Sequence, residues 1–141
     1  MPSVLLRYLA LGLPATTAVV AAAMATVYGG AFPGFAFVAI EAGLLFAVSV
    51  PILAAVMLLR RRGWAVAGTA FISGAVAANL AIKQAATWSV GRTEVIGFVP
   101  VATDGVLTTA GFAGYATFYL VVAAVQFGTL RIASAIFSTE P

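Results

Sequence analysis

Glu41 and Lys83 are ionisable residues inside long apolar runs of the sequence, and they are the first candidates for chemistry. The chain of 141 residues has only four acidic residues, and Glu41 is one of them. Glu41 lies roughly 9 Å inside its run at the rise of an α-helix. A charge at such a depth in a membrane is costly and often marks a transport pathway or a buried ion pair.

Lys83 lies at nearly the same depth in the next apolar run, counted from its far end. The short turn Arg60–Gly63 makes these two runs antiparallel neighbours, so we expect Glu41 and Lys83 to face the interior and to interact, directly or through water. Two alternatives stay open. Lys83 extends to the membrane interface while Glu41 is neutral or bonded to backbone, or the charges contact another subunit.

Further polar side chains follow the same run as Lys83. Ser73, Asn79 and Lys83 share one face at helical spacing, and Gln84 lies beside it. With Glu41 they form the predicted intramembrane polar cluster. This face either packs closely against neighbouring helices or lines a polar track that opens to the outer side.

The segment from Ser89 to Thr109 carries the other polar residues of interest, Arg92, Glu94 and Asp104. The dipeptide that begins at Asp104 is Asp-Gly, which predicts a turn. The stretch EVIGFVPV is apolar enough to lie on the membrane surface or to dip into it. The spacing of the two carboxylates does not fix their separation in space.

The stretch AGFAGYATFY, Ala110 to Tyr119, combines small residues with two tyrosines. It is suited to contact a lipid, a pigment or a partner in the outer leaflet. Helix packing with anchoring at the interface explains the same pattern.

Several classes of chemistry are excluded by composition. The chain has no cysteine and no histidine, so disulfides, thiol redox chemistry and the usual ligands of zinc and haem iron are missing. Ser73 and Lys83 are about 15 Å apart along one helix, and GGAFPG lacks the Lys-Ser/Thr of a phosphate loop. We therefore recognise no catalytic residues, metal site or cofactor, and an enzyme ranks third among the function classes.

The elements that position these residues follow from the hydrophobic pattern. The chain is 63% hydrophobic and 8% charged, whereas soluble domains carry about a quarter charged residues. Four apolar runs approach the roughly 20 residues that span a bilayer. We predict an all-α integral membrane protein, a single domain built as an antiparallel four-helix bundle with a long outer loop. The predicted helices run from about Leu5 to Tyr28, Phe35 to Leu59, Trp64 to Thr87 and Ala110 to Ile132, and the loop covers about 89–109.

Basic residues predict the orientation. The triplet Arg60, Arg61 and Arg62 would lie on the same side as Arg7 and Arg131 if the helices alternate. The positive-inside rule then predicts a multi-pass protein of the cell membrane with both termini in the cytoplasm. Contact of the triplet with anionic lipid head groups is an alternative role. The basic residues are too dispersed for a nucleic-acid surface.

Two functions follow as expectations. The first is an accessory or scaffolding subunit that assembles with other membrane proteins or with itself in the lipid bilayer. The second is a small oligomeric transporter or channel that uses Glu41, Lys83 and Asn79. A transporter predicts a water-accessible cavity that reaches Glu41. A subunit predicts co-purification with a partner and an apolar face without a continuous cavity.

Overall fold

Four long helices make up most of this protein, for which the structure is a computed structural model. The structure describes residues 2–28 and 34–138, with side chains from 5 to 27 and from 34 to 135. All four helices are long and apolar enough to cross a membrane, as the sequence predicted. They are α1 (Pro2–Tyr28), α2 (Phe35–Val56), α3 (Trp64–Val90) and α4 (Thr109–Ser138).

One of the two short connections between helices is described. The other, between α1 and α2, for which the glycines and proline of Tyr28–Gly34 predict a tight turn, lies outside the described residues. Between α2 and α3 a 3-10 segment, η2 (Met57–Arg62), carries the arginine triplet. Gly63 then takes a φ of 109°, a conformation that favours glycine. Helix α2 therefore ends slightly earlier than predicted, and α3 extends to Val90.

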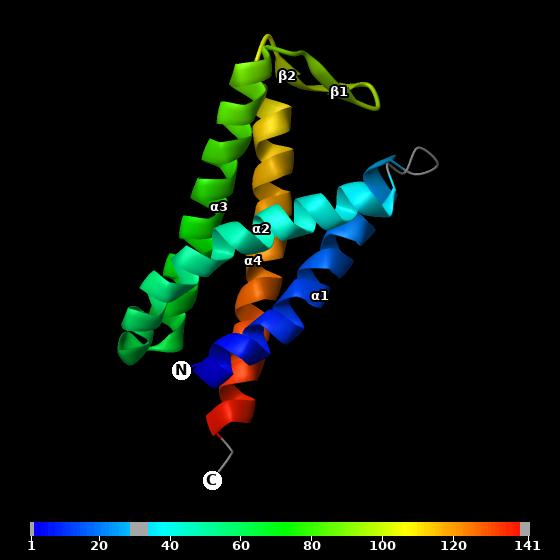
Figure 1. The fold of residues 1–141 in the computed structure, drawn as a ribbon. Helices are drawn as coiled ribbons and strands as arrows, with labels where there is room; N and C mark the ends of the chain where they lie inside the picture. The colour runs from blue at the N-terminus through cyan, green and yellow to red at the C-terminus, as the bar shows by residue number, and fades with distance from the viewer. Residues whose placement is uncertain (1, 29–33, 139–141) are drawn as a thin grey trace.

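The four helices pack together toward one end of the molecule and diverge toward the other (Figure 1). Helices α3 and α4 lie side by side, while α2 crosses in front and α1 leans away from α4 (Figure 1). We call the end that carries the strands the sheet end and the opposite end, at η2, the arginine end. The separation of α1 from α4 widens toward the sheet end (Figure 1).

The larger of two buried clusters lies toward the arginine end. Tyr8 stacks on Phe46 with ring centroids 5.2 Å apart, and its hydroxyl hydrogen-bonds Ser49 at 3.0 Å. Phe71 is fully buried between α3 and α4, at 6.0 Å from the ring of Phe127. A second buried cluster, made of side chains from α1, α2 and α4, lies nearer the sheet end.

The predicted outer loop folds into a small antiparallel sheet, which the hydrophobic pattern had not indicated. Its strands are β1 (Glu94–Ile96), β2 (Val99–Thr103) and β3 (Val106–Leu107), in that order. The β2–β3 turn is Asp104–Gly105, with φ of 49° and 84°. Two positive φ values are what a type I′ hairpin turn requires, so the turn predicted at Asp104 is confirmed.

Candidate functional site

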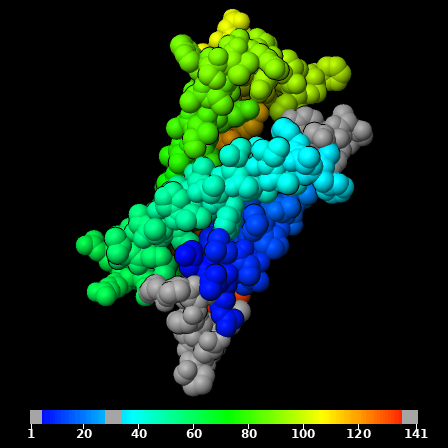
Figure 2. All heavy atoms as spheres, in the orientation of Figure 1, coloured from blue at the N-terminus to red at the C-terminus, as the bar shows by residue number. Residues whose placement is uncertain are grey.

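A cavity of about 1160 Å³ lies at the sheet end, where α1 and α4 separate. Helix α1, the first turns of α2, helix α4 and the strands β1 and β2 supply its wall, and α3 contributes a single residue. In the space-filling view the surface is hollowed between α2 and the sheet, with α4 at the base (Figure 2). We call this space the sheet-end cavity.

Most of the wall is apolar. Helix α1 contributes small and aliphatic side chains at Val19, Ala22 and Ala23. Phe37 of α2 and Val121 of α4 extend the apolar surface. Such a wall suits hydrocarbon, and the few polar groups in it would set orientation and specificity.

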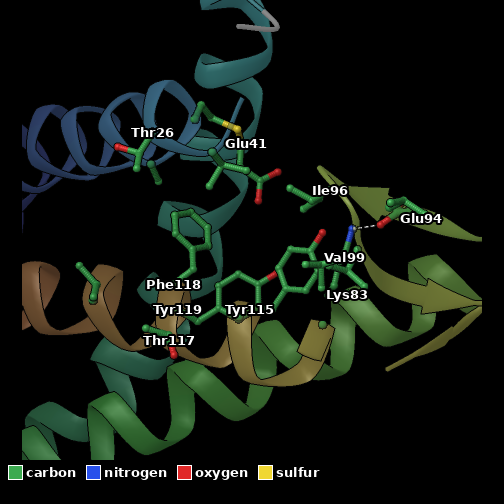
Figure 3. A pocket seen from close by; sticks show the side chains of 18 of the residues that line it. Thr26, Glu41, Lys83, Glu94, Ile96, Val99, Tyr115, Thr117, Phe118 and Tyr119 are labelled. Carbon is green, nitrogen blue, oxygen red and sulfur yellow. Dashed lines mark hydrogen bonds and ion pairs between the residues drawn. The ribbon is translucent and has the colours of Figure 1, made fainter. Parts of the chain in front are cut away.

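The cation in the wall is Lys83 of α3. Its ammonium lies 3.5 Å from a carboxylate oxygen of Glu94, at the start of β1, and 4.7 Å from the centre of the Tyr115 ring. The dashed line in Figure 3 marks the Lys83–Glu94 contact, which joins α3 to the sheet. The loop carboxylate, not Glu41, is therefore the ion-pair partner of Lys83.

Glu41 lines the same cavity from α2. In Figure 3 its carboxylate points into the space between α2 and the sheet. Within the described part of the chain, it has no hydrogen bond and no ion pair, although Lys83 is near enough to act on it through space. Glu41 and Lys83 thus line one cavity without a direct contact between them.

Aromatic side chains of α4 form the wall between these charges. Tyr115 and Tyr119 stack with ring centroids 6.1 Å apart, and Phe118 lies 5.5 Å from Tyr119. Figure 3 shows the three rings beside Glu41 and Lys83. They belong to the stretch Ala110 to Tyr119, for which the sequence left open a contact surface or helix packing, and they line the cavity.

Gln84 holds the sheet in place over the helices. Its amide nitrogen donates to the carbonyl of Gly105 at 2.9 Å, and its amide oxygen accepts from the backbone N–H of Leu107 at 3.1 Å. Gly105 itself is packed against the last turn of α3, with Thr87 and Trp88 at about 3.3 Å from the position of a Cβ. Gln84 therefore belongs to the support of the sheet, and it does not line the cavity.

The start of α4 is joined to β2. The hydroxyl of Thr108 accepts from the N–H of Gly111 at 3.0 Å, which caps the helix. The same hydroxyl donates to the carbonyl of Pro100 at 2.6 Å. A Cβ at Gly111 would overlap the Val101 carbonyl, so β2 lies directly on the first turn of α4.

The remaining members of the predicted cluster lie apart. Asn79 is buried and donates to the carbonyl of Ala75 in its own helix at 2.9 Å. Ser73 is exposed and lines a shallow groove on α3 with Ala65, Val66, Thr69 and Ala70. The structure thus does not form a continuous polar track from Asn79 and Ser73 to the cavity.

The other predicted residues divide between the two ends. Arg92 and Glu94 line the cavity, while Asp104 is exposed in the β2–β3 turn. Arg60, Arg61 and Arg62 lie at the arginine end. Arg131 places its guanidinium 4.7 Å from the ring of Trp64, also at that end.

Three residues that line the cavity were not predicted from the sequence. They are the small residues Ala22 and Ala23 of α1, and Ile96 at the end of β1. The small side chains in α1 were a signal, because they leave room beside a neighbouring helix. The position of Ile96 depends on the fold of the sheet and had no local signal.

Comparison of the chain with protein-family models, with curated proteins and with solved structures finds no match. Among the described residues, no group of three or more acidic side chains is placed to hold a metal ion.

Proposed function

We propose that this protein is a multi-pass membrane protein that binds an amphiphilic molecule, and that the sheet-end cavity is the binding site. The observation that supports this most directly is the cavity itself, with about 1160 Å³ of space, an apolar wall and an ion pair at its edge. This volume is slightly above the roughly 300–1,000 Å³ of pockets that hold drug-sized ligands, so it has room for a molecule with a long apolar body.

The choice between the two expected functions follows from the same geometry. A cavity that reaches Glu41 is what handling of a ligand requires, and it favours the transporter alternative over a purely structural subunit. Ser73, Asn79 and Gln84 lie at separate places in the fold, and this argues against a polar channel through the molecule. We therefore propose that the protein binds a ligand from the lipid. The proposal holds whether or not the protein also transports that ligand across the membrane.

Gly114 provides the test. It lines the cavity, and a Cβ at this position would have no atom within 4 Å. Gly114→Trp would add an indole at the cavity wall, and its Cβ would meet no atom within 4 Å. Gly128 is the matched control, because it is an exposed glycine of α4 outside the cavity with the same free space.

The measurement is mass spectrometry of the amphiphile that stays with protein purified in a mild detergent. We expect the wild type and Gly128→Trp to retain one defined amphiphile in about equal amount, and Gly114→Trp to lose most of it. Equal retention by all three proteins, or no retained amphiphile in the wild type, would contradict the proposal.

A role as an accessory subunit is the second proposal, and the groove on α3 favours it. The groove consists of small side chains, at Ala65, Thr69, Ala70 and Ser73 among others. Small residues allow another membrane helix to approach closely. Protein bands retained in the same preparation test this role, and a chain that purifies alone as a monomer counts against it.

We further propose the orientation that the arginines predict, with the sheet end outside the cell membrane and both termini in the cytoplasm. In this orientation the sheet-end cavity lies at the level of the outer leaflet.

A further inference from the structure

The wall of the sheet-end cavity carries equal numbers of positive and negative charges, but only one pair of them is in contact. Glu41, Lys83, Arg92 and Glu94 line it, which gives two charges of each sign. Lys83 and Glu94 are 3.5 Å apart and largely neutralise one another. The lining charges outside this pair are the carboxylate of Glu41, on α2, and the guanidinium of Arg92, which is exposed where the chain leaves α3.

We expect an anionic ligand to bind weakly beside Lys83 and Glu41. To reach the Lys83 ammonium it would have to displace the carboxylate of Glu94, which would then lose its partner. The same anion would be repelled by Glu41 on the neighbouring wall. A neutral ligand would offer Glu41 at most an uncharged donor, and such a hydrogen bond is weaker than a charge-assisted one.

A cation would meet favourable groups on two sides. The carboxylate of Glu41 accepts charge-assisted hydrogen bonds. The rings of Phe37, Phe118 and Tyr119 line the cavity with it, and the face of an aromatic ring attracts an organic cation.

We infer that the ligand is an amphiphilic amine in its cationic form, with its ammonium group at Glu41 and its apolar body along α1 and α4. This inference rests on the proposed function and adds the chemical class of the ligand. The body would lie against Val19, Ala22 and Val121, which form the apolar part of the wall.

The experiment compares three probes with the same chain, namely dodecylammonium, dodecyl sulfate and the uncharged dodecanol. Binding is measured by calorimetry to the full-length protein in nanodiscs of phosphatidylcholine, with empty nanodiscs as the blank. We expect the wild type to bind dodecylammonium at least about tenfold more tightly than dodecanol, because the cation gains a charge-assisted hydrogen bond. Dodecyl sulfate should bind most weakly.

Two carboxylate variants test the assignment to Glu41. Glu41→Gln should bring the affinity for dodecylammonium down to that for dodecanol and leave the affinity for dodecanol unchanged. Asp104→Asn is the matched control, because Asp104 is an exposed carboxylate at the same end outside the cavity, and asparagine tolerates its positive φ. This variant should keep the preference of the wild type.

The outcomes separate this inference from the proposed function. If the probes bind and Gly114→Trp abolishes binding, but Glu41→Gln keeps the preference for the amine, the cavity is a binding site and the assignment of the ligand class is wrong. A preference for dodecyl sulfate would also overturn it. If no probe binds, or if Gly114→Trp binds every probe as the wild type does, the proposed function fails and this inference fails with it.

Discussion

The side chain of Gln84 connects two parts of the molecule that the sequence separates by about twenty residues. Both of its amide atoms hydrogen-bond the backbone of the sheet, at Gly105 and at Leu107. Neighbouring Lys83 makes the second link, through Glu94. These adjacent residues of α3 have different roles, because one supports the sheet and the other lines the cavity.

Replacement of Gln84 by leucine should loosen the sheet without disturbing the helices. The carbonyl of Gly105 and the N–H of Leu107 would lose their partner, and such a loss costs about 1–3 kcal/mol for groups shielded from water. We expect faster amide hydrogen exchange across 94–107 in Gln84→Leu. Exchange within α1 should not change.

Ser89→Ala is the control for this prediction. The hydroxyl of Ser89 bonds only the carbonyl of Ala86 in its own helix, at 2.8 Å, and it is exposed. Its removal should leave exchange in the sheet as in the wild type. Unchanged exchange in Gln84→Leu would mean that the amide does not hold the sheet.

Among the elements, the helices were predictable from the sequence and the sheet was not. Long apolar runs determine the helices because each run must satisfy its backbone hydrogen bonds internally when it lies in lipid. The Asp104–Gly105 turn was also predictable, since the dipeptide suits positive φ. The short strands have no such signal, because their register depends on contacts with Gln84, Thr108 and Gly111.

The candidate site was only partly predictable for the same reason. Helical spacing placed Glu41 and Lys83 at a similar height, and both line the cavity. The partner of Lys83 could not be predicted, because Glu94 reaches it through the fold of the loop. Nor could the spacing show that Asn79 satisfies its side chain within its own helix.

Gly111 is the point at which the sheet and α4 come closest, so a methyl group there should destabilise this junction. We expect Gly111→Ala to lower the stability by about 1–3 kcal/mol, as overpacking commonly does. The measurement is the midpoint of thermal unfolding in detergent. Gly114→Ala, one turn later, has free space for the methyl group and should unfold at or above the wild-type midpoint. Equal midpoints for both variants would contradict this packing.

On the scale of the whole molecule, the two ends differ in chemistry. The arginine end carries three consecutive basic residues on η2 and the Arg131–Trp64 contact. The sheet end carries the strands and the cavity. This difference is the basis of the proposed orientation.

Labelling of single cysteines tests that orientation, and the absence of cysteine from the chain gives a clean background. Thr103→Cys lies in the sheet and Arg61→Cys at the arginine end, and both positions are exposed. An impermeant maleimide should label Cys at 103 in intact cells and Cys at 61 only after permeabilisation. Labelling of both from the same side would rule out the four-span arrangement.

Helix α1 leans away from α4, and the opening between them determines the units in which the affinity of a ligand for the sheet-end cavity should be expressed. The wall that these helices share is apolar and lies within the candidate spans, so under the proposed function a ligand should dissolve in the bilayer before it binds. Its effective concentration is then its mole fraction among the lipids. Added vesicles should weaken apparent binding in proportion to their amount, and two compounds of equal intrinsic affinity should rank by their partition coefficients.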